Sequence, residues 1–140
     1  MSAYLPERID GRGINLSNRY AHSAAVVASP AAGAETIIAT ITLPSQVQTF
    51  SAVRLTGYAA FTVGTSGVSA ELQIRQTDTS GTALVTSGAL TVTAADLVGL
   101  AVLGFDIVPS AGQVYVLTLT VGSGAAESTV SAVALDALIV

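Results

Sequence analysis

The chain has 140 residues, the size of one domain, and it is 51% hydrophobic but only 10% charged. Its net charge of -4 disfavours general binding to nucleic acid, which relies on clustered Lys and Arg, and the absence of Cys excludes disulfides and thiolate chemistry. No apolar run approaches the ~18 residues of a membrane span, and the N-terminus lacks a signal-peptide core, so no membrane partner and no signal-directed secretion are expected.

Residues 1–21 differ from the rest of the chain and predict an extended N-terminal arm ahead of a β-sandwich domain at 22–140. Three Arg and two acids give the arm a charge of +1, whereas the rest of the chain carries -5. Pro6, Gly11 and Gly13 disfavour a long helix or strand there. We expect the arm to lie on a partner; a frayed terminus or a strand on its own sheet are the alternatives. The arm residues expected to contact the partner are Tyr4, Leu5, Arg8, Ile9, Arg12, Ile14, Leu16, Arg19 and Tyr20.

Short strands are predicted at 24–28 and 36–43, and two longer ones follow. Residues 53–63 have apolar side chains or Gly at odd positions, and residues 68–75 have apolar side chains at even positions. The Gly-rich break at 64–67 predicts that these two strands form an antiparallel hairpin. The expected core face of the hairpin consists of Val53, Leu55, Ala59, Phe61, Ala70, Leu72 and Ile74.

The second half of the chain continues the pattern of short strands separated by turns. Thr93 followed by Asp96 predicts a single capped helical turn. Residues 100–108 are apolar on both faces except at Asp106, which predicts a strand covered on both sides. The other strands expected here are 83–85, 90–92, 113–121 and 128–140.

About eight or nine strands with no helical periodicity predict an all-β fold, an antiparallel β-sandwich of the jelly-roll type. The residues alone do not separate a jelly roll from an immunoglobulin-like sandwich. The Cys pair and core Trp of true immunoglobulin domains are absent.

No constellation of residues predicts catalysis, a metal site or a cofactor. His22 is the only histidine, and it lies at the junction of arm and sandwich, a poor place for a preorganised triad. One His without Cys cannot complete a zinc site. Asp78, Asp96 and Glu127 are scattered among the loops, and calcium binding by such carboxylates stays open.

Too few charged residues remain to cover the surface of a monomer, so we expect part of that surface to be buried against other copies of the chain. A surface of uncharged Thr and Ser is the alternative. Asp106 is expected to pair with Arg54 or Arg75, within the fold or across a subunit contact, or to face solvent at a bulge. The residues assigned to the subunit interface are Arg54, Tyr58, Arg75 and Asp106.

Three stretches carry a resemblance to a known group of proteins: Glu71–Arg75 with Ser80–Thr82, Gln113–Leu119, and Val133–Val140. With them, Phe50–Val140 resembles the small jelly-roll proteins of tailed-phage virions, which include capsid decoration (cement) proteins and trimeric head or fibre-tip domains. The resemblance implies a non-enzymatic structural protein on the capsid surface, made in the host cytoplasm. It also implies a homotrimer without cofactors, whose arm reaches a neighbouring trimer or the major capsid protein.

Two other roles compete with decoration of a capsid. A receptor- or glycan-binding tip domain of a phage fibre or spike would use its loops for recognition, although the chain has no Trp and few other aromatic residues for stacking on sugars. A major capsid subunit usually has a strongly basic arm for nucleic acid, and a charge of +1 suits that role poorly.

Overall fold

The computed structural model describes residues 19–23, 30–45, 52–125 and 128–139, which contain nine β-strands and no helix. The predicted all-β class is therefore confirmed. The strands are β1 Arg19–Ser23, β2 Glu35–Thr42, β3 Val53–Val63, β4 Val68–Gln76, β5 Ala83–Thr86, β6 Leu90–Val92, β7 Val98–Asp106, β8 Val114–Val121 and β9 Ser128–Ile139.

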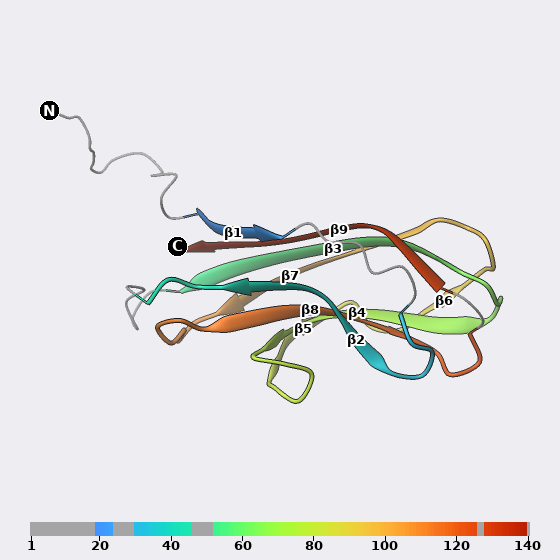
Figure 1. Cartoon of the computed structure of the whole chain (residues 1–140), viewed down its shortest axis with the longest axis horizontal. Coiled ribbons are helices and arrows are strands. Elements are labelled where there is room, and N and C mark those ends of the chain that lie inside the picture. The colour runs from blue at the N-terminus through green and yellow to red at the C-terminus, as the bar shows by residue number, and fades with distance from the viewer. Residues whose placement is uncertain (1–18, 24–29, 46–51, 126–127, 140) are drawn as a thin grey trace, which may run out of the picture.

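The strands form two antiparallel sheets packed face to face (Figure 1). Sheet A has the order β1-β9-β3-β7, and sheet B has the order β2-β8-β4-β5 with β6 also paired to β4. In Figure 1, β1, β9 and β3 lie in the upper layer, and β8, β4 and β5 lie in the lower layer. The chain crosses repeatedly between the sheets, and the last strand lies between the first and the third. This is the strand order of a jelly roll, which settles the choice between the two sandwich types.

Every second side chain of the central strands points between the two sheets and forms the core. Phe61 of β3 and Tyr115, Leu117 and Leu119 of β8 are fully buried there. All seven residues predicted for the core face of residues 53–75 are buried, so that prediction is confirmed. Alternating polarity was enough to identify the core-facing residues, because each of these strands has one face in the core.

The predicted pairing of β3 with β4 in a hairpin is wrong, because the two strands lie in different sheets. β3 pairs with β7 and β9, whereas β4 pairs with β8, β5 and β6. Residues 64–67 carry the chain from one sheet to the other. A hairpin and such a crossing bury the same alternate side chains, so the sequence pattern does not distinguish them. The outer faces of β3 and β4 consequently lie on opposite sides of the molecule.

Gly57, in the middle of β3, allows the two sheets to approach closely. A Cβ atom at this position would lie 2.6 Å from Leu117 Cδ1 and 3.2 Å from Val102 Cγ2. Any other residue would have to displace core side chains that are already fully packed. The glycine that interrupts the apolar pattern of β3 is therefore part of the core.

Three predictions near strand ends need revision or stay open. Arg19 and Tyr20, which were assigned to the arm, lie in β1 and pair with β9, while their contact with a partner stays a prediction. The other arm residues, at 1–18, and the strand predicted at 24–28 lie outside the described residues. The helical turn predicted at Thr93 is wrong: residues 93–97 form a turn in which the Asp96 N–H donates to the Thr93 carbonyl, and Ala95 has a φ of +66° that ends any helix.

Candidate interaction surface

β7 presents its apolar side chains to two different environments. Val102 points between the sheets and is buried, whereas Leu103 and Phe105 point outward with 55% and 50% of their surface exposed. The expectation that residues 100–108 are covered on both sides is therefore wrong for the single chain. The described strands form only two layers, so the outer face of sheet A has no strand over it.

Asp106, at the end of β7, ties sheet A to sheet B. Its side chain points between the sheets, is only 5% exposed, and accepts hydrogen bonds from Tyr115 Oη at 2.7 Å and Gln76 Nε2 at 2.9 Å. The backbone N–H of Val108 donates a third bond at 3.1 Å. These bonds offset the cost of burying a carboxylate.

The expected partners of Asp106 were therefore wrong, since neither arginine is among the residues that bond to it here. The reason is the direction of the side chain: Asp106 faces the interior, and the strand alternates. Because Asp106 is fixed inward, its neighbour Phe105 must point outward. The buried carboxylate thus sets the orientation of the exposed aromatic ring.

The phenol of Tyr115 donates to Asp106 from inside the core. Burial, together with the hydrogen bond to the Asp106 carboxylate, raises the pKa of Tyr115 well above its ordinary value near 10. The phenol is consequently neutral at physiological pH and remains a donor to the carboxylate.

The outer face of sheet A over β9, β3 and β7 is the candidate interaction surface, and we call it the apolar face. Two charged residues, Arg54 and Asp136, lie toward one end of it, and the other ten residues are apolar or small except Thr56 and Tyr58. The backbone register arranges its twelve residues in four rows, which are Leu138–Arg54–Phe105, Asp136–Thr56–Leu103, Ala134–Tyr58–Ala101 and Ala132–Ala60–Gly99.

Tyr58 lies along the sheet at the centre of the apolar face. A Cβ atom on Gly99 would be 3.1 Å from Tyr58 Oη and 3.3 Å from its Cε1, so the ring rests over the glycine. The side chain is still 43% exposed. A hollow of about 370 Å³ beside the ring is lined by Thr56, Gly57, Tyr58, Ala101, Val102, Leu103, Ala134 and Asp136. The small alanines leave room there for a side chain of a partner.

The apolar surface continues past the end of β7. Ile107 and Val108 follow directly after Asp106 and are 74% and 68% exposed. Monomeric proteins rarely expose contiguous apolar patches of this kind unless they bind something. The apolar face and this loop together favour a contact with another molecule.

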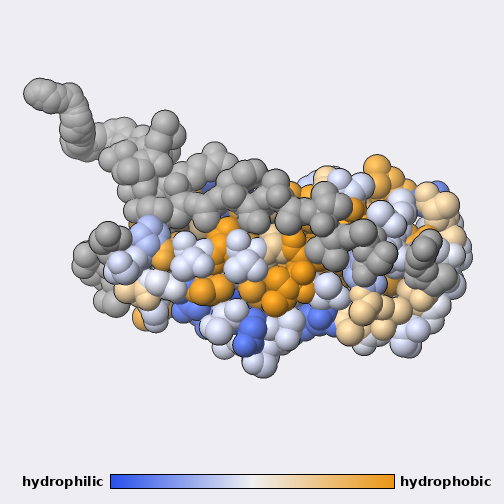
Figure 2. Space-filling model, viewed as in Figure 1, coloured by the Kyte–Doolittle hydropathy of each residue, from blue (hydrophilic) through white to orange (hydrophobic). Residues whose placement is uncertain are grey.

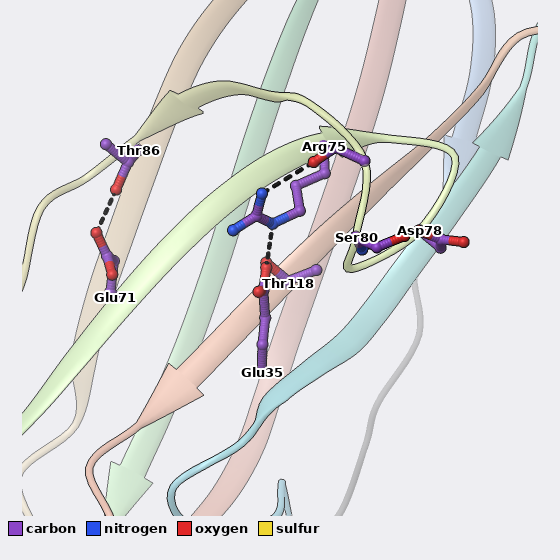
Figure 3. Close-up of polar contacts among 8 residues, drawn as sticks. Glu35, Glu71, Arg75, Asp78, Ser80, Thr86 and Thr118 are labelled. Carbon is purple, nitrogen blue, oxygen red and sulfur yellow. Dashed lines mark hydrogen bonds and ion pairs between the residues drawn. The ribbon is translucent and has the colours of Figure 1, made fainter.

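The outer face of sheet B is polar, and its side chains bond to one another (Figure 3). Arg75 Nε donates to Glu35 Oε2 at 2.6 Å, and Arg75 Nη1 donates to the carbonyl of Gly81 at 2.9 Å. The hydroxyl of Thr118 donates to the same oxygen of Glu35. Three strands, β2, β4 and β8, are joined in this way on the surface of the sheet.

Further polar contacts extend this face toward β5. The hydroxyl of Thr86 donates to Glu71 Oε2 at 2.6 Å. In the loop after β4, hydrogen bonds from the side chain and the backbone of Ser80 lower the pKa of Asp78. Figure 2 shows hydrophilic residues along the lower edge of the view, where this loop lies, and hydrophobic residues in the middle.

The four residues predicted for the subunit interface do not form one surface. Arg54 and Tyr58 lie together on the apolar face, Arg75 lies on the opposite side of the molecule, and Asp106 lies between the sheets. The prediction missed Leu103 and Phe105. The signal for them was the apolar run at residues 100–108, whose second apolar face has none of the described strands over it.

The described residues offer little for bound metals. No group of three or more His, Cys, Asp or Glu residues within them is placed to hold a metal ion. Asp78 and Asp96 lie in separate loops, after β4 and after β6, and Glu127 lies outside the described residues. No helix in the described part of the chain is long and apolar enough to cross a membrane.

No family model matches this chain, and no curated protein matches it in sequence. Solved structures share its fold, namely the jelly roll of a viral capsid protein. A structure of infectious bursal disease virus, strain Gx, matches with a TM-score of 0.55 and 11% identity, over 85% of this chain and 31% of that chain.

Two structures of the VP2 protein of infectious bursal disease virus give similar values. The VP2 subviral particle matches with a TM-score of 0.53 and 10% identity, over 86% of this chain and 30% of that chain. A mutant VP2 protein in T=1 particles matches with a TM-score of 0.54 and 11% identity, over 96% of this chain and 37% of that chain. The chain thus spans about a third of the length of these proteins.

Proposed function

We propose that this chain is a structural virion protein, a capsid decoration (cement) protein that binds the outside of a tailed-phage head. It associates there with copies of itself as a homotrimer and with the major capsid protein. The observation that carries this proposal is the apolar face, with Tyr58, Leu103 and Phe105 about half exposed on a chain with only 10% charged residues. A surface of this kind is stable in water when a neighbouring subunit covers it.

The fold and the energetics of burial support this role. The jelly roll is shared with VP2, whose structures are of virus particles, although at 10–11% identity the likeness concerns the fold. Burial of a half-exposed Leu or Phe gains about 1 to 2 kcal/mol per side chain. Small gains of this size become a stable coat when many symmetric copies repeat them.

The two outer faces take different roles in this proposal. The apolar face contacts a neighbouring subunit, while sheet B, whose Glu35, Arg75 and Thr118 already bond to one another, faces the solvent. The arm adds contacts to a neighbour or to the capsid. The protein stabilises the particle by linking subunits, and no chemical step is involved.

Particles that lack the protein provide the test. Purified protein is added to such particles, which are then imaged by electron microscopy and heated until they release their contents. We expect added density on the outside of the shell and a higher temperature of release. A folded protein that gives neither result contradicts the proposal, and purified protein that closes into shells on its own would identify a shell subunit instead.

A matched pair of variants links this test to the apolar face. Leu103→Ser with Phe105→Ser removes two exposed side chains from sheet A, and we expect it to prevent decoration. Ile37→Ser removes a 39% exposed aliphatic side chain from β2 of sheet B, and we expect it to decorate normally. An equal loss of decoration in both variants would contradict a specific role for the apolar face.

A second candidate is the receptor- or glycan-binding tip domain of a fibre or spike. The hollow beside Tyr58 favours it, because about 370 Å³ is within the range of ligand pockets, and an aromatic ring and the carboxylate of Asp136 are both among its lining residues. A glycan array with the wild-type protein and with Tyr58→Ala tests this role. Binding that disappears in the variant would support it over decoration.

A further inference from the structure

The size of the apolar face indicates what kind of partner covers it. Four rows of residues on three strands measure roughly 20 Å by 10 to 15 Å at ordinary strand spacings. Its length of about 20 Å matches an extended segment of about six residues.

A segment with suitable chemistry is present in the same chain. Residues 1–18 contain five large apolar side chains in addition to Met1, and no Lys, and they precede β1 directly. Tyr4, Leu5, Ile9, Ile14 and Leu16 are spaced too irregularly for one strand or helix face with a core of its own. Side chains of this kind gain stability by lying on an apolar surface that another element has already formed.

Charges at one end of the apolar face match charges in this segment. Arg54 is an exposed cation on the face, and the segment contains Glu7 and Asp10. Opposite charges on the two sides of a contact fix its register more than they add to its affinity.

The direction of β1 favours a neighbouring copy as the one that receives the segment. Arg19 pairs with Leu138 and Ser23 pairs with Leu135, so β1 enters the sheet at the row that contains Arg54 and Phe105. A chain that continues this strand backward from Arg19 leaves the end of the sheet and moves away from its own apolar face. Eighteen extended residues reach up to about 60 Å, enough to reach a neighbouring molecule.

We propose that residues 1–18 of one copy lie in extended form across the apolar face of a neighbouring copy, with a large apolar side chain in the hollow beside Tyr58. Each copy both gives a segment and receives one, which closes a symmetric oligomer. This inference deepens the subunit contact of the proposed function, on which it rests. It can fail while the virion role stands.

The absence of native Cys allows a direct test by disulfide crosslinking. One preparation has a single Cys in the segment, at Leu5→Cys, Ile9→Cys or Ile14→Cys, and the other has Leu103→Cys and a tag of different mass. The two are mixed, oxidised and separated on a non-reducing gel. We expect a mixed disulfide dimer from at least one segment position, and little from the control in which Thr42→Cys on β2 replaces Leu103→Cys.

Two outcomes would overturn the inference. The first is a disulfide within one chain when Ile9→Cys and Leu103→Cys are combined in the same dilute molecule, because the segment would then cover its own face. The second is the absence of mixed dimers at all three segment positions.

A truncated chain provides the second measurement. All nine described strands lie within residues 19–139, so a chain without residues 1–18 keeps the sandwich. We expect this chain to be monomeric in sedimentation experiments. If it still forms the oligomer, and Leu103→Ser disrupts that oligomer, a folded surface covers the apolar face instead. That result overturns the inference and leaves decoration of particles to be tested separately.

Discussion

The outer faces of the two sheets arise from the same alternation of side chains along the strands, yet they differ in how their side chains are satisfied. On sheet B, Glu35, Arg75 and Thr118 bond to one another within the chain. On sheet A, Leu103 and Phe105 are about half exposed. A polar face whose groups bond to one another is stable in water, whereas exposure of an apolar face to water costs free energy until another molecule covers it. The difference indicates which side of the molecule contacts others.

Removal of the buried carboxylate between the faces has the largest expected effect. Asp106→Ala leaves the Tyr115 hydroxyl and the Gln76 amide buried without their acceptor, so we expect the free energy of unfolding to fall by about 3 kcal/mol. Urea unfolding followed by circular dichroism measures this. Asp96→Ala, at an exposed turn, is the control and should change the value by less than about 0.5 kcal/mol. Equal effects of the two variants would contradict the assigned role of Asp106.

Polar substitutions on the apolar face are expected to act on association and not on folding. Leu103→Ser with Phe105→Ser should weaken self-association roughly a hundredfold, which corresponds to about 2.7 kcal/mol. The free energy of unfolding of the monomer should change little, because both side chains point away from the core. Sedimentation over a range of concentrations measures the association constant. Ile37→Ser is the control, and a similar loss there would remove the contrast between the two faces.

The two arginines of the strands test each face separately. Arg75→Ala breaks the ion pair with Glu35 and the bond to the Gly81 carbonyl, and we expect a loss of about 1 kcal/mol in stability without any change in association. Arg54→Ala, on the apolar face, should do the reverse: unchanged stability and weaker association. Thermal unfolding measures the stability of both variants, and sedimentation measures their association. Weaker association in Arg75→Ala and lower stability in Arg54→Ala would show that the wrong face was assigned to the contact.

Alkaline pH provides an effect on stability that is absent at pH 7. Because the pKa of Tyr115 is raised in the folded protein, the folded state holds more protons than the unfolded chain above pH 10. The free energy of unfolding should therefore fall as the pH rises through this range, by up to about 1.4 kcal/mol per pH unit. Tyr115→Phe should lose this slope and Tyr58→Phe should keep it. The same slope in Tyr115→Phe would contradict the assignment.

The strands and most of the core could be predicted from the sequence, because each central strand has one face in the core. The alternation in residues 53–63 and 68–75 gave the correct inward side chains of β3 and β4. The same alternation could not give the pairing of these strands. Which sheet a strand joins depends on β7, β8 and β9, whose partners are distant in the sequence.

The candidate surface could be predicted only in part. The apolar run at 100–108 indicates two covered faces, but no local pattern says whether the second cover comes from the chain itself or from another copy. Asp106 has its partners on β8 and β4, and Arg75 has its partner on β2, contacts that form only when both sheets are complete. Long-range polar contacts of this kind leave no periodic signal in a sequence.

The position of β9 has a consequence for the order of folding. β9 lies between β1 and β3 at the centre of sheet A, and it supplies one residue to each row of the apolar face. β3 cannot complete its pairing until this most distant strand arrives, which makes the closing step slow. A chain that is still folding therefore has no finished docking surface. Under the proposed role, the molecule can assemble only when its fold is complete, and partly folded copies do not enter the coat.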